Sequence, residues 1–528
     1  MKSSEDLTMP CRIMNTMPST PLLSRVQPLA LALALGLASG ETFAEHAMAT
    51  HAVPVGSRAT KQAAAPKNAR SPRPDGSILW SVDNCNDAGA GSLRDAALHA
   101  NSGDGIDMGG LSCSTISLTS GAITLHDVEL LGPGAGQLEI DGTGNQNHRI
   151  FNHAGGGGLL DISGVTINGG KYVSNAGLGG GCLRSVGGSL RISDSVFRNC
   201  MVVTPVGQDG NARGGAIAFY GDGDVHLYGT TIESNSARTD HEFAEGGALY
   251  SQGEVFLRRS TIANNSVSAS GDSIGQTSGG GLFVQGSVSI EDSTLDGNTA
   301  SRDAGAAWIG EGGVLLRSTV SNNFAGAGTP GIVMLGRANA VAGIYSSTIS
   351  GNVAEQSTQW LSGGLYLNTA TTTIANCTIT ANSETNQVAT KFGAGIVFGR
   401  DVISVTMSGT IVEGNYFDDG EPPYAADDID GPESLTILGD ANMVGWTHRP
   451  VPADTIFGLD PGLGPLQDNG GPTRTHLPLP NSPALEASSA HGFDTDQRGY
   501  PRIVGAAADI GSVESGNDSV FASGFELP

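Results

Sequence analysis

The residue types best suited to catalysis in this chain are the acidic side chains of three loops. They are Asp240, His241, Glu242 and Glu245 in the segment TDHEFAEGG, Asp272 in the following loop, and Arg302 and Asp303 in the loop after it. Hydrolysis of a glycosidic bond needs two or three facing carboxylates, and elimination needs a base together with groups that neutralise a uronate. Neighbouring loops of a repeating fold share one edge, so these side chains are candidate catalytic groups. A set of solvated loops is the alternative, because an acidic protein collects carboxylates there without catalytic purpose.

A recurring apolar position supplies candidate ligand-binding residues. Three residues after an opening glycine stand Tyr250, Phe283, Trp308, Met334, Tyr366 and Phe398. The flanking positions are mostly aliphatic and alternate side chains of a strand face opposite sides, so we expect the five aromatic residues to point outward. Six coils about 4.8 Å apart would display a row about 24 Å long, which suits sugar rings or a partner's apolar face. The alternative is an internal aromatic stack, or a row that the chain's own loops cover.

The acidic stretch DDGEPPYAADDID (residues 418–430) contains the candidate metal ligands Asp427, Asp428 and Asp430. Carboxylate oxygens suit Ca²⁺, the one cofactor that the sequence suggests. No fixed ligand spacing accompanies these residues, so a solvated loop is the alternative. The eleven histidines are scattered, and no Cys/His spacing predicts zinc.

The elements that must position these residues follow from a repeated phrase: an aliphatic residue, two others and then Asn. The phrase ends at Asn168, Asn199, Asn235, Asn265, Asn298, Asn323, Asn352, Asn382 and Asn415. Its steps of 25 to 36 residues indicate stacked repeats. Within a repeat, three short runs alternate apolar with small or polar residues, and none has helical spacing.

These patterns predict an all-β fold, a right-handed parallel β-helix with three strands per coil. We expect Asn at the end of the third strand because Asn tolerates a left-handed bend. Stacked coil on coil, these side chains would form a hydrogen-bonded ladder. The regular spacing of these Asn residues therefore reflects the fold and not a catalytic role.

Composition agrees with an exported solenoid. Gly accounts for 78 of the 528 residues, and the formal net charge is −25. Such a surface repels nucleic acid and anionic lipid, and it disfavours polyanionic sugars unless a cation bridges them.

The N-terminus predicts secretion. Basic residues precede the apolar stretch PLALALALGLASG (residues 28–40), and a small-residue site follows at Thr42-Phe43-Ala44. We predict a signal peptide over residues 1–44 and a flexible linker over residues 45–77. No transmembrane segment is expected, because this apolar run is too short to span a bilayer and nothing later approaches one.

Cysteine usage fits export to an oxidising compartment. Cys11 leaves with the signal peptide, and we expect disulfides between Cys85 and Cys113 and between Cys182 and Cys200. Cys377 stands where other repeats have Ser, so we expect a small buried residue there.

Both ends of the chain resemble known families. DAGAGSLRDAALHANSGDGIDM (residues 87–108) resembles the N-terminal cap and first coils of bacterial surface β-helix proteins of the CSLREA-motif type, with Gly91 and Asp95 replacing the motif's leading Cys and its Glu. GGAI (residues 214–217) and the repeated phrase resemble polymorphic outer membrane protein repeats, without their usual Phe. Residues 428–445, DPGLGPLQDNGGPTRTHLPLPNSPALEA (460–487), TDQRGYPR (495–502) and ADIGSVE (508–514) resemble the choice-of-anchor Q domain.

The resemblance implies an exported, pectate-lyase-like β-helix held at or beyond a bacterial surface. Its expected parts are a cap and first coils over residues 78–160 with a short helix near Leu93–Ala100, repeats over 161–417, a choice-of-anchor Q-like domain over 418–514, and a tail over 515–528.

For function, we expect a secreted, extracellular or cell-surface adhesin that binds a glycan or a cell-surface partner without catalysis and does not bind nucleic acid. A polysaccharide lyase or glycoside hydrolase that uses the same groove is the alternative, and a structural surface spacer is the third interpretation. Clustered acids above the aromatic row would favour catalysis, whereas the row alone would favour binding.

Overall fold

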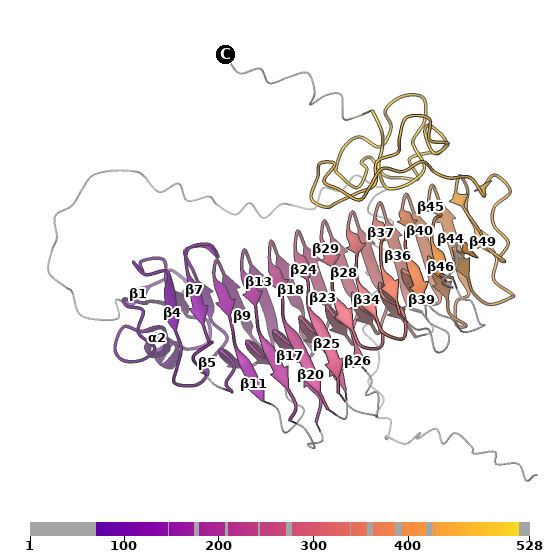
Figure 1. Cartoon of the computed structure of the whole chain (residues 1–528). Helices are drawn as coiled ribbons and strands as arrows, with labels where there is room; N and C mark the ends of the chain where they lie inside the picture. The colour runs from indigo at the N-terminus through magenta and orange to yellow at the C-terminus, as the bar shows by residue number, and fades with distance from the viewer. Residues whose placement is uncertain are drawn as a thin grey trace, which may run out of the picture. The chain divides into compact units, whose positions relative to one another are not determined.

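Four parallel sheets dominate the computed structural model, which describes residues 70–516 except 146, 174–178, 206–209, 241–242, 271–276, 338, 356–362, 386–392, 419–424 and 427. The sheets contain 14, 13, 11 and 10 strands and are called A, B, C and D in that order. Neighbouring strands come from successive coils, so the chain is a parallel β-helix (Figure 1). The predicted all-β fold is confirmed, and the described residues contain one helix, α2 (Leu93–His99).

Each central coil has one strand in each of the four sheets, where the sequence predicted three strands per coil. One coil runs through β18 (Val225–Tyr228) in sheet A, β19 (Thr231–Glu233) in sheet B, β20 (Ser236–Thr239) in sheet D, β21 (Ala244–Glu245) in a separate three-stranded sheet and β22 (Leu249–Ser251) in sheet C. The sheet D strand was not predicted, because it follows the repeated Asn in the part of the repeat that was expected to be a loop. Ser234, with φ 57°, is left-handed and turns the chain sharply between β19 and β20.

Sheet C positions the candidate site. Its strands are β5 (Ile123–Leu125), β8 (Phe151–Ala154), β12 (Leu183–Val186), β17 (Ile217–Tyr220), β22, β27 (Leu282–Val284), β31 (Ala307–Ile309), β35 (Ile332–Leu335), β39 (Leu365–Asn368), β43 (Ile396–Phe398) and β48 (Ile429–Asp430). Leu249 pairs with Leu282, which pairs with Ala307. All three belong to the one large core cluster inside the solenoid, so the next residue of each strand faces outward.

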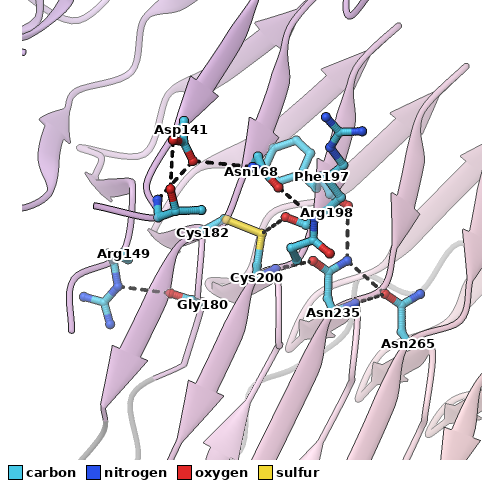
Figure 2. The surroundings of a disulfide bond; sticks show 12 residues. Asp141, Arg149, Asn168, Gly180, Cys182, Phe197, Arg198, Cys200, Asn235 and Asn265 are labelled. Atoms are coloured by element: carbon cyan, nitrogen blue, oxygen red, sulfur yellow. Dashed lines mark hydrogen bonds between the residues drawn. A yellow bond between two sulfur atoms is a disulfide. The ribbon is translucent and has the colours of Figure 1, made fainter. Parts of the chain in front are cut away.

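Seven buried asparagines, one per coil, form the predicted ladder. They are Asn235, Asn265, Asn298, Asn323, Asn352, Asn382 and Asn415. The side-chain Nδ2 of each donates to Oδ1 of the next at 2.7–3.0 Å (Figure 2). The same Oδ1 also accepts the backbone N–H of the Asn before it, as Asn265 does at 3.0 Å from Asn235.

Two members of the predicted series lie outside this ladder. Asn199, with φ 55°, is the left-handed residue, and the ladder position in its coil is the next residue, Cys200. Asn168 instead ends strand β10 (Thr166–Asn168) and accepts from the Asn199 side chain at 2.8 Å. In the ladder coils the left-handed residue also precedes the ladder Asn, as at Asn264 and Asn322. The prediction that the ladder Asn itself forms the bend is therefore wrong by one residue.

Both ends of the ladder are closed. The Cys200 backbone N–H donates to Asn235 Oδ1 at 2.8 Å, and Cys200 forms the predicted disulfide with Cys182 (Figure 2). At the other end Asp428 replaces Asn: its Oδ1 accepts the backbone N–H and the Nδ2 of Asn415 at 3.0 and 2.8 Å. Its Oδ2 accepts the Trp446 N–H at 2.8 Å.

A second ladder, made of hydroxyl groups, lies between sheets A and B. The backbone N–H of Ser260 donates to Ser293 Oγ at 3.0 Å, and the same contact links Ser293 to Ser318 and Ser318 to Ser347 at 3.1 Å. Cys377 occupies this place in the next coil and is fully buried, as its position in the repeat predicted. Burial raises the pKa of its thiol to about 12.

The N-terminal coils carry the helix and the second disulfide. Helix α2 begins after Ser92, whose hydroxyl accepts the Asp95 N–H at 3.2 Å, and it buries Leu93, Ala96 and Ala97. Cys85 and Cys113 are joined as expected. Strand β1 (Arg70–Pro72) pairs antiparallel with β2 (Ile78–Ser81), so regular structure begins inside the segment predicted as a linker.

Residues after β51 (Ile456–Phe457) form an irregular segment that contacts the outer face of sheet B (Figure 1). Thr348 Oγ1 donates to Gln497 Oε1 at 2.6 Å, and Ser350 Oγ lies 2.8 Å from His476 Nε2. Within the segment, Arg498 Nε donates to Asp496 at 3.0 Å, and Asp496 also accepts the Glu514 N–H at 3.1 Å. The charged residues of TDQRGYPR and ADIGSVE therefore stabilise this segment's own backbone.

Candidate functional site

The described loop acids each bind a different part of the chain. Asp240 accepts from Ser270 Oγ at 3.0 Å, and Glu245 forms an ion pair with Arg213 at 2.7 Å. Asp303 accepts the N–H groups of Ala304 and Thr329 at 2.8 and 2.9 Å. In these contacts each acid binds a nearby side chain or backbone group and not another of the candidate acids. His241, Glu242 and Asp272 lie outside the described residues.

The register of sheet C defines an outer row that includes most of the predicted aromatic residues. In coil order the row is Thr124, Asn152, Arg184, Ala218, Tyr250, Phe283, Trp308, Val333, Tyr366, Val397 and Asp430. The rings of Tyr250 and Phe283 stack at 5.7 Å between centroids, and those of Phe283 and Trp308 at 4.4 Å. Tyr220, at the end of β17, tilts against Tyr250 at 5.4 Å.

Two of the predicted row members face the other way. Met334 and Phe398 pair into the column of Ile309 and Leu367 and belong to the core. Their outward placement was wrong because the glycines from which they are counted, Gly331 and Gly395, stand one position later in the coil than Gly247. In a strand, a shift of one residue moves a side chain to the opposite face.

Five members of the outer row are buried, among them two of the predicted aromatic residues. Tyr250 is 0% exposed and Phe283 is 7% exposed, whereas Trp308 and Tyr366 are partly exposed. The Arg213 guanidinium lies 4.9 Å from the centroid of Tyr250, and burial raises the pKa of that tyrosine to about 12. The open 24 Å platform expected from the sequence is thus reduced to its C-terminal part.

That part borders a pocket of about 510 Å³. The pocket is lined by Tyr366, Asn368, Val397, Phe398, Gly399, Arg400, Asp401, Asp430, Gly431 and Pro432, from β39, β43, β48 and the turns that follow them. Phe398 contributes to the wall although it is only 2% exposed. Parallel strands ending at one edge bring these turns together although they are some 30 residues apart in sequence.

Hydrogen bonds fix the polar side chains of the pocket. Asn368 Nδ2 donates to Asp401 Oδ2 at 3.0 Å, and the Asp401 N–H donates back to Asn368 Oδ1 at 2.9 Å. Asp430 Oδ1 accepts the Gly431 N–H at 2.7 Å and lies 3.7 Å from Arg449 Nε. The pocket thus presents two carboxylates and an amide in fixed positions.

Tyr366 lies in the field of several charges. Burial raises the pKa of its phenol, and the carboxylates of Asp401 and Asp303 raise it further. One predicted loop acid, Asp303, is therefore close to one predicted aromatic residue. Burial also raises the pKa of Asp303 to about 6, although two backbone N–H groups act in the opposite direction.

The predicted Ca²⁺ ligands have different roles in the structure. Asp428 is fully buried and ends the Asn ladder, whereas Asp430 faces the pocket, and Asp427 lies outside the described residues. No group of three or more His, Cys, Asp or Glu side chains suited to a metal ion occurs in the described part of the chain. Asp428 was misassigned because sequence does not distinguish an acid in a loop from one that replaces a ladder Asn.

A buried Ser-His-Asp arrangement was not anticipated. His153 Nδ1 lies 2.7 Å from Ser185 Oγ, and its Nε2 lies 3.0 Å from Asp127 Oδ1. Ser185 and His153 are both 0% exposed and stand in the inward column of sheet C. A substrate cannot reach this hydroxyl, so we interpret the arrangement as a satisfied polar group in the core.

The polar pocket residues Asn368, Arg400 and Asp401 were also missed. The available signal was their position just after the strand runs at the same edge of consecutive coils. Comparisons with protein-family models, with curated proteins and with solved structures gave no match. Within the described ranges, no helix has the length and apolar character needed to cross a membrane.

Proposed function

We propose that the chain is an exported surface protein that binds a glycan in the pocket beside Tyr366. The observation that carries this proposal is the pairing of a partly exposed tyrosine ring with fixed carboxylate and amide groups. An aromatic ring packs on the C–H face of a sugar, and the polar groups bind its hydroxyls. Two disulfides and the N-terminal segment support export, and the anchor-like C-terminal segment supports retention at a surface.

The test is retention of the mature chain on a glycan array and a polysaccharide panel, with and without Ca²⁺. Tyr366→Ala should weaken binding at least about tenfold, or ~1.4 kcal/mol. Tyr228→Ala is the control, because Tyr228 is an exposed tyrosine at the end of a sheet A strand, away from the pocket. Equal loss in both variants, or no retention of the parent chain on any glycan, would contradict the proposal.

A second candidate function is glycan cleavage, favoured by the two carboxylates Asp401 and Asp430 in one pocket. The same panel is scored for new reducing ends and for unsaturated products. Product that disappears in Asp430→Asn would establish an enzyme, whereas retention without product supports an adhesin. A structural spacer would bind no glycan and release no product.

A further inference from the structure

Two arginines lie near the N-terminal end of the outer row of sheet C. Arg184 of β12 and Arg149, which precedes β8, both donate to Asn152 Oδ1, at 3.3 and 3.5 Å. Arg149 also donates to the carbonyls of Gly179 and Gly180 at 3.1 and 3.2 Å, and its guanidinium lies 3.8 Å from the Tyr172 centroid. These partners are neutral: among the described residues, neither arginine forms an ion pair with a carboxylate.

A third arginine, Arg213, lies nearby and pairs with Glu245 at 2.7 Å. Among the ion pairs of the described residues, one carboxylate therefore balances one of the three guanidinium groups. All three groups act on Tyr220: burial raises the pKa of its phenol, and Arg213, Arg184 and Arg149 act in the opposite direction. The Arg184 guanidinium lies 5.8 Å from the Tyr220 centroid. This end of the row is therefore positive on a chain whose net charge is −25.

Two unbalanced guanidinium groups in a partly buried place are unfavourable without an anion. Arg149 is 9% exposed, and the buried Nε of Arg184 has no hydrogen-bond partner. The planar fork of an arginine matches the paired oxygens of a carboxylate or sulfate.

We propose that Arg149 and Arg184 bind a carboxylate or sulfate group of an acidic glycan. The inference rests on the proposed function and names its ligand class. It also revises, for this part of the surface, the expectation that the acidic chain disfavours polyanionic sugars.

The first experiment measures binding of a uronic-acid oligosaccharide and of its carboxyl-reduced, neutral counterpart. The parent chain should bind the acidic form at least tenfold more tightly, and Arg184→Gln should remove this preference while neutral binding is unchanged. Arg191→Gln is the matched control, because Arg191 is an exposed arginine on the neighbouring strand β13 (Ser189–Ser193) of sheet A. Equal binding of the two sugars by the parent chain, or an unchanged preference in Arg184→Gln, would overturn the inference.

A second experiment separates this inference from glycan binding itself. Sodium sulfate is compared with sodium chloride at equal ionic strength, and the melting temperature is recorded for the parent, Arg184→Gln and Arg191→Gln. Sulfate stabilises proteins generally, so the specific effect is the part lost in Arg184→Gln and kept in Arg191→Gln, which we expect to be about 1 °C or more. Such a loss without retention on any glycan would sustain the anion site and reject the proposed function. Identical sulfate responses in all three proteins would reject the anion site.

Discussion

At the scale of single residues, the ladder asparagines have the largest structural role relative to their size. Asn323 Nδ2 donates to Leu295 O and Asn352 Oδ1, and its own Oδ1 accepts both the backbone and the side-chain N–H of Asn298. All these groups are buried, so water cannot replace a lost partner. One small side chain thereby connects three consecutive coils.

Asn323→Ala should lower the free energy of unfolding by about 3 kcal/mol, since it leaves several buried polar groups unpaired. Chemical denaturation followed by circular dichroism measures the change. Asn322→Gly is the control: Asn322 is the exposed, left-handed neighbour with φ 54°, where glycine is favourable, and we expect a change within about 1 kcal/mol. Similar effects of the two substitutions would show that the ladder contributes little.

Ala381 is an exception among the left-handed residues that precede the ladder asparagines, because alanine does not favour this conformation. It has φ 58°, a conformation that costs an alanine roughly 1 kcal/mol, whereas Gly351 and Gly414 hold the equivalent position in the coils before and after it. Ala381→Gly should therefore raise the melting temperature. Ala375→Gly, in the regular strand β40 (Thr371–Ala375), should lower it. A lower melting temperature for Ala381→Gly would contradict this account of the bend.

Single residues also mark the limit of sequence-based prediction. The period-two pattern identified the outward column at Tyr250, Phe283, Trp308 and Tyr366, because alternation in a strand is a local property. It failed at Phe398, because a glycine can open a coil at either of two adjacent positions. It could not show that Tyr250 is covered, since coverage depends on loops from other coils.

At the scale of elements, the repeat predicted the stacked strands, but it did not predict the fourth strand of each coil. A single left-handed residue such as Ser234 separates sheet B from sheet D. The residue type at this position varies from coil to coil among Ser, Asn, Gly and Ala. The pocket could not be predicted from the sequence for a related reason. Asn368 and Asp401 belong to different coils, and only the register of β39 and β43 brings them into contact.

The disulfide at the start of the ladder should stabilise the elements around it. Its closed loop spans 18 residues, for which the chain-entropy estimate is about 3 kcal/mol. Cys182→Ser with Cys200→Ser should reduce the free energy of unfolding by roughly that amount. Cys377→Ser serves as the control, because Ser holds the same ladder position in other coils, and it should change stability by less than about 1 kcal/mol. A larger loss of unfolding free energy from Cys377→Ser than from the double variant would refute the stabilising role of the Cys182–Cys200 disulfide.

At the scale of the whole molecule, buried carboxylates should make stability depend on pH. Burial raises the pKa of Asp428 to about 6, above its ordinary value of 3.8. Between these two values the folded state binds the proton more readily than the unfolded state. The contribution of Asp428 to the free energy of unfolding is therefore fully present below about pH 4 and is lost as the pH rises through 6.

Asp428→Asn removes this titration, so the fall in unfolding free energy between pH 4 and pH 7 should become shallower by about 1 to 3 kcal/mol. Denaturant titrations at several pH values measure the slope. Asp222→Asn, in the turn between β17 and β18, controls for the loss of one negative charge. Equal slopes for the parent and for Asp428→Asn would show that Asp428 ionises in the folded state as it does in water.

The order of donors and acceptors in the Asn ladder has an electrical consequence. Every ladder amide, from Asn235 to Asn415, donates one N–H to the ladder residue of the next coil and directs its oxygen toward the previous one, while its Nδ2 also donates to a backbone carbonyl of the previous coil. Seven side-chain dipoles are thus aligned, much as peptide dipoles are in an α-helix. The positive end of this column meets the Asp428 carboxylate, and the negative end meets the neutral Cys182–Cys200 disulfide. The interior of the solenoid is therefore polarised along its axis, and the carboxylate of Asp428, at the positive end, has the sign of charge that this polarity favours.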